Sequence, residues 1–275
     1  MNSLRYTLMS GAGNTFVVLD RRTLPNETAP AELVVPLCTR FDVDGLITVD
    51  PAEAPLDFRM LYFNRDGTTG MMCGNGGRCA VAFAEAHGMV RNPERIAFEN
   101  AGVDYSARLS GLGVSVAFPP PRRVELDIAL PLLHRTVTAH FVDVGTPHAI
   151  VEAGELGLDA ASLHQLDIDH WGAALRSHER FGLEGANANF MVLDGNTVRL
   201  RTFERGVEGE TGACGTGAIA SALVAHLLHD LPSPVTLIPT SGRPLRIHFH
   251  RDGESFTGIE LEGDAEIRSE HQGGE

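Results

Sequence analysis

The chain contains no lysine, since all 22 of its Lys and Arg residues are arginines. Schiff-base catalysis needs a lysine amine, so the sequence excludes a lysine nucleophile and pyridoxal phosphate held by a lysine. The P-loop motif also requires a lysine, so that mode of nucleotide binding is excluded as well. Any chemistry at a carbon acid must therefore proceed without this electron sink, and we expect no cofactor.

Positive charge, long apolar runs and cysteines are also scarce. The formal net charge of −14 argues against a nucleic-acid partner or an anionic membrane surface. No apolar run reaches the roughly 18 residues that a membrane helix needs, and the segment Met1–Ser10 lacks the regions of a signal peptide. The 4 cysteines are too few for a disulfide framework, and none are spaced as in Cys-x-x-Cys zinc sites. These absences predict a cytoplasmic protein with no metal site.

Two segments of the chain nearly repeat each other, and each ends in a cysteine followed by glycines. The first contains Arg59, Phe63 and Arg65 and then Met72-Cys73-Gly74-Asn75-Gly76. The second contains Arg199, Phe203 and Arg205 and then Ala213-Cys214-Gly215-Thr216-Gly217. The repeat suggests two thiols that face one site. Such a pair suits an enzyme that removes a proton from one face of a carbon and returns it to the other face.

Short runs of β-branched and aromatic residues, separated by turn residues, predict strands throughout the chain. We expect them at 16–19, 46–49, 58–63, 113–118, 136–144, 149–151, 188–193, 197–203, 235–238, 245–249 and 256–261. Two helices are predicted over 76–87 and 217–229, each just after a repeat cysteine, and the second is apolar around most of its surface.

The prolines at 119–121 cannot lie in a central strand and mark the best domain boundary. We therefore predict an α+β fold with two similar halves, residues 1–118 and 119–262. Each half is expected to be a curved, mostly antiparallel sheet wrapped on a central helix.

Cys73 and Cys214 are candidates for an acid and base pair. A thiol has a pKa of about 8.5, so a small fraction is thiolate at neutral pH, and a helix N-terminus stabilises that anion. The glycines after each cysteine let backbone amides approach an α-carboxylate and stabilise the charge that develops when its α-proton leaves. Two alternatives stay open at this point: buried, inert cysteines, or a redox pair that closes a disulfide.

Three other residues are candidates for adjusting the thiols or binding a substrate. His148 follows a Gly-Thr-Pro turn at a strand end, where functional loops are common. Glu204 holds the repeat position of Asn64, which would make the two halves inequivalent. Arg205 could bind a second carboxylate through two parallel hydrogen bonds, or it could form an ordinary surface ion pair.

The motifs resemble those of the diaminopimelate epimerases, a pyridoxal-independent family of amino-acid epimerases, over nearly the whole chain. The matching blocks are Met9–Phe16, Arg40–Leu46, Phe63-Asn64, Met72–Cys79, Val144–His148, Asn187–Phe190, Glu204–Gly206 and Ala213–Gly217.

The resemblance implies a fold and a function. It implies two homologous halves with the active site in the cleft between them, and a last strand, near 256–268, that returns to the first half. It implies inversion of LL-2,6-diaminopimelate to the meso form in lysine or peptidoglycan-precursor biosynthesis, by a homodimer.

The resemblance also implies roles for individual residues. Cys73 and Cys214 would be the two bases, with His148 and Glu204 assisting. The reacting end of the substrate would lie on Asn14, Gly74, Asn75, Gly215 and Thr216. The distal carboxylate and amine would lie on Asn64, Asn187, Glu204 and Arg205.

Two departures from the family pattern concern the substrate. Members usually have Asn where this chain has Thr146, and some have Gln where it has Gly45. In the family the Asn amide reaches the distal end of the substrate, and at Gly45 a side-chain contact from that loop is absent. A racemase of another amino acid, such as histidine or proline and hydroxyproline, is therefore the alternative function. In proline racemase-like enzymes a His follows the first Cys-Gly, where this chain has Asn75. A thiol redox switch is the alternative outside enzymes.

Overall fold

The computed structural model describes residues 4–24, 30–69 and 73–272. The chain divides into two compact units. We call residues 1–117 together with 262–275 unit 1, and residues 118–261 unit 2. Among the described residues, no helix is both long and apolar enough to cross a membrane.

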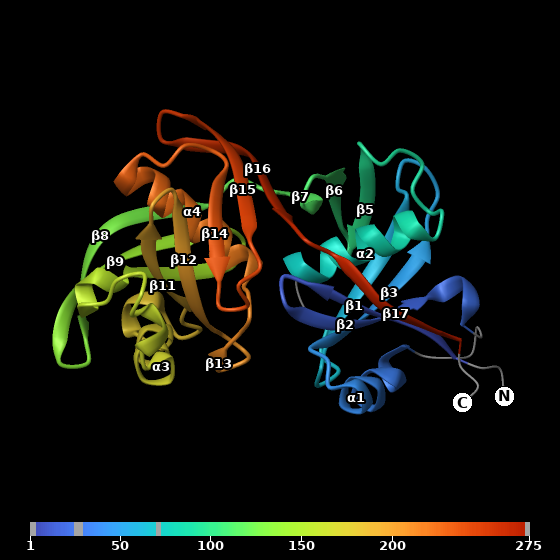
Figure 1. The fold of residues 1–275 in the computed structure, drawn as a ribbon, viewed down its shortest axis with the longest axis horizontal. Helices are drawn as coiled ribbons and strands as arrows, with labels where there is room; N and C mark the ends of the chain where they lie inside the picture. Colours follow the sequence, from blue (N-terminus) through green and yellow to red (C-terminus); the bar gives the residue numbers. More distant parts are fainter. Residues whose placement is uncertain (1–3, 25–29, 70–72, 273–275) are drawn as a thin grey trace. The chain divides into compact units, whose positions relative to one another are not determined.

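Unit 1 combines a mostly antiparallel sheet with two helices (Figure 1). Its strands are β1 (Arg5–Gly11), β2 (Asn14–Asp20), β3 (Gly45–Pro51), β4 (Phe58–Asn64), β5 (Ile96–Asn100), β6 (Val103–Ser110), β7 (Gly113–Phe118) and β17 (Glu266–Gln272). The pairs β2–β3 and β4–β5 are parallel, and the helices α1 (Pro30–Phe41) and α2 (Gly74–Ala86) form their crossovers.

Alternating side chains of the unit 1 strands point to opposite faces of the sheet, and one helix packs on each face. Val17 and Leu46 pack in a buried cluster with Val34 and Leu37 of α1. Their neighbour Ile47 points the other way, toward the start of α2 at Gly76. The helix α2 also contacts β1, β2, β3, β4 and β17, so it is the central helix around which the sheet of this unit is arranged.

Unit 2 repeats this plan. Its strands are β8 (Arg123–Leu132), β9 (Arg135–Asp143), β10 (Pro147–Glu152), β11 (Asn187–Asp194), β12 (Thr197–Glu204), β13 (Gly209–Glu210), β14 (Val235–Pro239), β15 (Leu245–Asp252) and β16 (Ser255–Gly263), which ends in unit 1. The parallel pairs β10–β11 and β12–β14 are joined by α3 (Ile168–Arg176) and α4 (Gly215–His229). Short 3-10 helices lie at Arg21–Thr23, Ala153–Leu156, Leu163–Gln165 and Glu179–Phe181.

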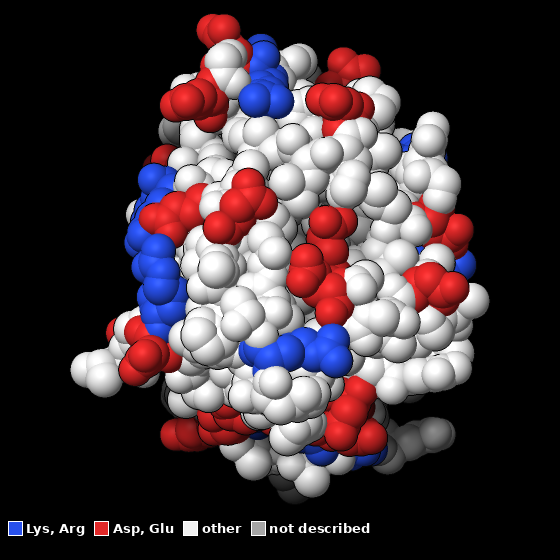
Figure 2. Space-filling view, turned by 90° about the vertical axis from the view of Figure 1, so that its left-hand side faces the viewer, with Lys and Arg blue, Asp and Glu red and all other residues white. Residues whose placement is uncertain are grey.

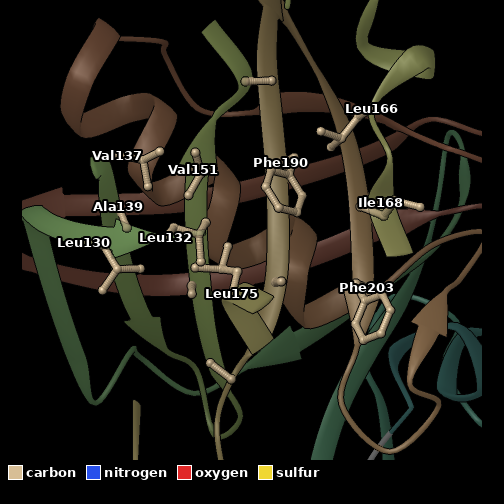
Figure 3. Close-up of a cluster of buried hydrophobic side chains, with 14 of the residues drawn as sticks. Leu130, Leu132, Val137, Ala139, Val151, Leu166, Ile168, Leu175, Phe190 and Phe203 are labelled. Atoms are coloured by element: carbon tan, nitrogen blue, oxygen red, sulfur yellow. The ribbon is translucent and has the colours of Figure 1, made fainter. Parts of the chain in front are cut away.

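The helix α3 packs on one face of the unit 2 sheet, and α4 is buried on strands β9 to β12, β14 and β15. Figure 3 shows the first of these interfaces, where Leu175 of α3 belongs to one buried cluster with Leu130, Val151 and Phe190 of the sheet. A Cβ on Gly172 would lie 2.5 Å from the Cβ of Phe203, so α3 approaches β12 as closely as only glycine allows. This contact holds the middle of α3 against the last residues of β12.

The predicted α+β class is therefore confirmed, with mainly antiparallel strands and few helices. Both predicted helices are present, but each begins two residues earlier than expected, at Gly74 and Gly215. The helices α1 and α3 and the strands β1, β5, β6, β8, β13 and β17 were not expected from the sequence.

Charged side chains are dispersed over the surface. On the face shown in Figure 2, the acidic groups lie in small separate clusters, with arginines between them and wide uncharged areas around them. Ion pairs of unit 2 include Arg180 with Glu125 at 2.9 Å and Arg199 with Asp194 at 2.7 Å.

Candidate active site

Cys73 caps the N-terminus of α2 in unit 1. Its backbone is extended, with φ −80° and ψ 112°, and its Sγ accepts a hydrogen bond from the Gly76 amide at 3.4 Å. The carbonyl of Cys73 accepts the Gly77 amide at 2.7 Å, which closes the first helical turn. The thiol is thus held at the positive end of the helix dipole, in a half-buried position. Met72, which precedes it in the motif, lies outside the described residues.

Asn75, in the same turn, has its amide orientation fixed by two neighbours. Arg78, which is fully buried, donates from Nη2 to Asn75 Oδ1 at 2.8 Å. Asn75 in turn donates from Nδ2 to Asn14 Oδ1 at 2.6 Å. Arg78 is itself held by the Asp264 carbonyl, which accepts from Nε at 3.2 Å. The predicted residues Asn14 and Asn75 are therefore in contact, and Arg78 supports them.

Cys214 caps α4 in unit 2 in the same way. Its backbone has φ −105° and ψ 113°, and its Sγ accepts the Gly217 amide at 3.4 Å. The Thr216 hydroxyl lies 3.6 Å from the same sulfur. Cys214 is 7% exposed and so is more deeply buried than Cys73. Each unit therefore presents one thiol on a helix N-terminus with the amides of a glycine-rich turn around it.

The two turns rest on different side chains in the two units. In unit 1, a Cβ on Gly76 would lie 3.3 Å from Ile47 Cδ1. Ile47 is opposite Tyr62 in the β3–β4 ladder, and the Tyr62 ring packs edge-on against Phe16 at 6.1 Å between centroids. We call Phe16, Ile47 and Tyr62 the apolar cluster. The start of α2 thus packs on hydrocarbon and aromatic groups.

In unit 2 the equivalent positions are polar. Asn189 is opposite Thr202 in the β11–β12 ladder, as Ile47 is opposite Tyr62 in unit 1. His148 pairs with Asn187, which lies two residues before Asn189 on β11. A Cβ on Gly217 would lie 2.5 Å from Asn189 Oδ1. We call His148, Asn189 and Thr202 the polar cluster. The repeat thus keeps the two cysteine turns and changes the chemistry beneath one of them.

His148 is fully buried within the polar cluster. Its Nδ1 lies 3.1 Å from Asn189 Nδ2, and its Nε2 lies 3.1 Å from the Thr146 hydroxyl. Burial and, to a smaller extent, the nearby Arg205 guanidinium lower the pKa of His148 to about 3. The imidazole is therefore neutral at ordinary pH, with both nitrogens engaged.

The predicted distal residues of unit 2 lie around the end of β12. Asn187 accepts the Arg205 amide on Oδ1 at 2.9 Å, which fixes the backbone at that position. The Arg205 guanidinium forms an ion pair with Glu184 at 3.0 Å, from a side chain that is 26% exposed. Glu204 accepts a hydrogen bond from the Thr211 hydroxyl. Arg205 is therefore both an ion-pair member and accessible to a second carboxylate.

Asn64, the residue of unit 1 predicted to bind the distal end, lies at the end of β4. Its Nδ2 donates to the Thr68 hydroxyl at 2.9 Å. Gly45 is opposite Asn64 in the β3–β4 ladder, and a Cβ there would lie 2.6 Å from the Phe63 carbonyl and 2.7 Å from the Tyr62 ring. A side chain at position 45 is thus excluded in this chain, because Tyr62 fills the space.

The sequence missed several residues that support this machinery. Arg78, Asn189, Thr202 and Glu184 were not candidates. Arg78, Asn189 and Glu184 each contact a candidate residue, and Thr202 contacts Asn189. A signal for Asn189 was present, since Asn187 and Asn189 are spaced for one face of a strand. Arg78 lies in the matching block Met72–Cys79, but its role depends on an acceptor 186 residues away, the Asp264 carbonyl.

Sequence comparison identifies the family of this chain. The sequence model of the family described as diaminopimelate epimerase matches residues 6–108 and 140–267. The chain is 39% identical to the diaminopimelate epimerase of Chlorobaculum tepidum, over 94% of this chain and 96% of that protein. It is 34% identical to the diaminopimelate epimerase of Aquifex aeolicus, over 90% of this chain and 91% of that protein.

Solved structures of low sequence identity share the fold. A hydroxyproline epimerase from Agrobacterium vitis has a TM-score of 0.70 at 17% identity, over 99% of this chain and 92% of that chain. A PhzF-family phenazine biosynthesis protein from Bacillus anthracis has a TM-score of 0.72 at 12% identity, over 98% of this chain and 99% of that chain. With the family model and the relatives above, these findings show that the chain belongs to the diaminopimelate epimerase family of isomerases.

Proposed function

We propose that this protein inverts the α-carbon of LL-2,6-diaminopimelate to give the meso form, without a cofactor, using Cys73 and Cys214. The observation that carries the proposal is the pair of cysteine-capped helices, one in each unit, in a chain of this family. The two curated relatives compared above are both named diaminopimelate epimerases, which supports the substrate.

In the proposed reaction, one cysteine acts as thiolate and the other as thiol. The thiolate removes the α-proton and forms an S–H bond, and the electron pair of the C–H bond moves into the adjacent carboxylate. The amides of the two glycine-rich turns stabilise this added charge, as an oxyanion hole does. The other thiol then delivers its proton to the opposite face of the carbon. Product differs from substrate only in configuration, and the two sulfurs have exchanged protonation states.

The remaining candidate residues would bind the two ends of the substrate. We place the reacting end on Asn14, Gly74, Asn75, Gly215 and Thr216, and the distal end on Asn64, Asn187, Glu204 and Arg205. Support for the distal assignment comes from the accessible Arg205 guanidinium, which can hold a carboxylate through two hydrogen bonds. We further propose that His148 assists the thiols as a neutral ring rather than as an imidazolium, given its burial.

The biological setting follows from the same substrate. We propose a cytoplasmic homodimer that acts in lysine or peptidoglycan-precursor biosynthesis on a small-molecule substrate. The formal charge of −14 favours neither a nucleic acid nor an anionic membrane as a partner.

The main alternative is a racemase of another amino acid. Two observations favour testing it: Thr146 replaces the usual Asn and hydrogen-bonds His148, and Tyr62 closes the space above Gly45. Histidine and proline or hydroxyproline are therefore substrates to compare.

The test is proton NMR of the reduced protein in D₂O with LL-diaminopimelate, histidine, proline or hydroxyproline. We expect loss of the α-proton signal with diaminopimelate and none with the other three. Exchange with another amino acid alone would contradict the substrate. No exchange with any of them under full reduction would contradict the enzyme and favour a thiol redox switch.

Cysteine variants test the two-base mechanism in the same assay. Cys73→Ala and Cys214→Ala should each abolish inversion. Cys38→Ala is the matched control, since Cys38 is buried between α1 and its sheet and burial raises its pKa to about 11. Full inversion by either of the first two variants would exclude the two-base mechanism.

A further inference from the structure

A chain of hydrogen bonds runs through the polar cluster and ends at Thr146. The Thr202 hydroxyl donates to Asn189 Oδ1 at 3.0 Å. Asn189 Nδ2 lies 3.1 Å from His148 Nδ1, and His148 Nε2 lies 3.1 Å from Thr146 Oγ1. Thr202 is 3% exposed, and Asn189 and His148 are fully buried, so water does not compete for these inner links.

The surroundings of Asn189 fix the direction of this chain. Its Nδ2 lies 3.1 Å from the Ala149 carbonyl and 3.2 Å from the Asn187 carbonyl, and carbonyls only accept hydrogen bonds. Its Oδ1 faces the Thr202 hydroxyl. The amide nitrogen, which faces His148 Nδ1, can donate a hydrogen bond but cannot accept one, so Nδ1 of the ring must be an acceptor. A neutral imidazole carries one proton, and that proton must be on Nε2.

The direction has a consequence for Thr146. Its hydroxyl oxygen accepts the Nε2 proton of His148. A hydroxyl has a single proton, and the Thr146 proton is then available to a group that is not part of this series of hydrogen bonds. Thr146 is half-buried, in contrast to the fully buried His148, so it is the accessible end. That proton can be donated to a hydrogen-bond acceptor, such as a carboxylate oxygen.

Unit 1 has no counterpart to this chain at the equivalent positions. There Ile47 takes the place of Asn189, and Phe16 takes the place of His148 in the strand register. Neither side chain can donate or accept a hydrogen bond. The polar cluster therefore occurs in unit 2, which contains Cys214, and apolar residues hold the positions of His148 and Asn189 in unit 1.

We infer that Asn189 is a positioning residue that holds His148 in its Nε2–H form and thereby makes Thr146 a hydrogen-bond donor to a carboxylate of the substrate. This inference rests on the proposed function for its substrate. The donor would add to the carboxylate binding by Arg205, whose charge also reaches His148.

The first experiment measures the tautomer and needs no activity. ¹⁵N-labelled histidine spectra of the whole protein, with His148→Gln to assign the signal, report which ring nitrogen carries the proton. We expect a neutral Nε2–H ring from pH 5 to 8. In Asn189→Asp, the carboxylate would accept from Nδ1, so the proton should move to that nitrogen. An Nδ1–H ring in the wild type would overturn the inference.

The second experiment measures steady-state kinetics with LL-diaminopimelate. Thr146→Val removes the donor and should raise KM about tenfold while kcat changes less than about threefold, with the tautomer unchanged. Thr146→Ser keeps the hydroxyl and should stay within about twofold of wild type. An unchanged KM in Thr146→Val would exclude the donor role, and this variant decides the question even if Asn189→Asp fails to fold. If the wild type does not turn over diaminopimelate, the proposed function fails, while the tautomer still tests Asn189.

Discussion

Ile47 and Asn189 hold equivalent positions in the two units, and each supports the first turn of a cysteine-capped helix. Ile47 lies under Gly76, and Asn189 lies under Gly217. The difference between them is chemical. A methyl end can move, whereas the Asn189 amide is held by hydrogen bonds to the backbone, to His148 and to Thr202.

This pair of glycines gives a matched test of the two turns. In Gly217→Ala the new Cβ would lie 2.5 Å from Asn189 Oδ1, so we expect a loss of about 2–3 kcal/mol in unfolding free energy and loss of inversion. In Gly76→Ala the nearest atom is the flexible Ile47 Cδ1 at 3.3 Å, so the loss should stay below about 1 kcal/mol. Urea unfolding of both variants measures the difference.

A double variant separates the clash from other effects of alanine. In the background of Asn189→Ala, the second substitution at Gly217 should cost much less than it does alone, because the obstructing oxygen is gone. Equal costs in both backgrounds would show that Asn189 is not what excludes a side chain at position 217.

The buried His148 predicts how stability depends on pH. Its pKa is lowered to about 3 in the folded protein by burial, whereas an unfolded histidine titrates near 6.5. The unfolded state therefore binds more protons between these values, and stability is full above the unfolded pKa and is lost as the pH falls toward the folded pKa. Between pH 7 and 4.5 this residue should account for a loss of about 2.5 kcal/mol in unfolding free energy.

The measurement compares wild type with His148→Gln in urea at the two pH values. Other histidines and carboxylates titrate in both proteins, so their effects cancel in the difference. Parallel stability curves for the two proteins would mean that His148 is not kept neutral by the fold.

A structural feature could be predicted from this sequence when the residues that determine it are close together in the chain. The cysteine-capped helices could be predicted because a cysteine, a glycine-rich turn and an apolar run are adjacent in the chain. The predicted helix starts lie two residues after the observed ones, because Gly74 and Gly215 are poor helix formers that tertiary packing nonetheless holds in the helix. Asn14 and Asn75 were predicted as site residues because the motifs that contain them resemble those of the family.

The parts that were missed depend on contacts distant in sequence. The helix α3 contains Gly172, which disfavours a helix locally but allows close packing on Phe203. The helix α1 contains Pro36, which also reads as a helix breaker. Glu184 and Arg205 are 21 residues apart, and no local pattern predicts their ion pair.

Arg176 should hold together the two loops that flank Arg205. It donates from Nε and Nη2 to Glu208 Oε1, at 3.0 and 2.8 Å, and from Nη1 to the Glu184 carbonyl at 3.0 Å. Glu208 in turn accepts the Gly206 amide at 3.0 Å. In Arg176→Met we expect amide exchange over residues 182–187 and 206–210 to become about tenfold faster, equivalent to about 1.4 kcal/mol.

Hydrogen-exchange mass spectrometry measures this effect. Arg199→Met is the matched control, because it removes an arginine from the Asp194 ion pair on the β11–β12 hairpin and touches neither loop. Unchanged exchange in both loops of Arg176→Met would show that the loops are ordered by other contacts.

Arg78 should control which way the Asn75 amide faces. A guanidinium only donates, so it holds Oδ1 of Asn75 and leaves Nδ2 directed at Asn14. In Arg78→Lys a single ammonium must replace donors to Asn75, to the Asp264 carbonyl and to the Gly74 carbonyl at 3.4 Å. Because these groups are buried, we expect a loss of about 2–4 kcal/mol in unfolding free energy and an increase of several-fold in KM for diaminopimelate.

The control for this substitution is Arg95→Lys, an equal change at an exposed position, which should stay within about 0.5 kcal/mol of wild type. Urea unfolding and steady-state kinetics on both variants make the comparison. If Arg78→Lys is destabilised while KM is unchanged, the guanidinium supports the fold of unit 1 without orienting Asn75. If stability and KM both match those of Arg95→Lys, the buried donor network is not what holds this turn, and the link from Arg78 through Asn75 to the substrate is wrong.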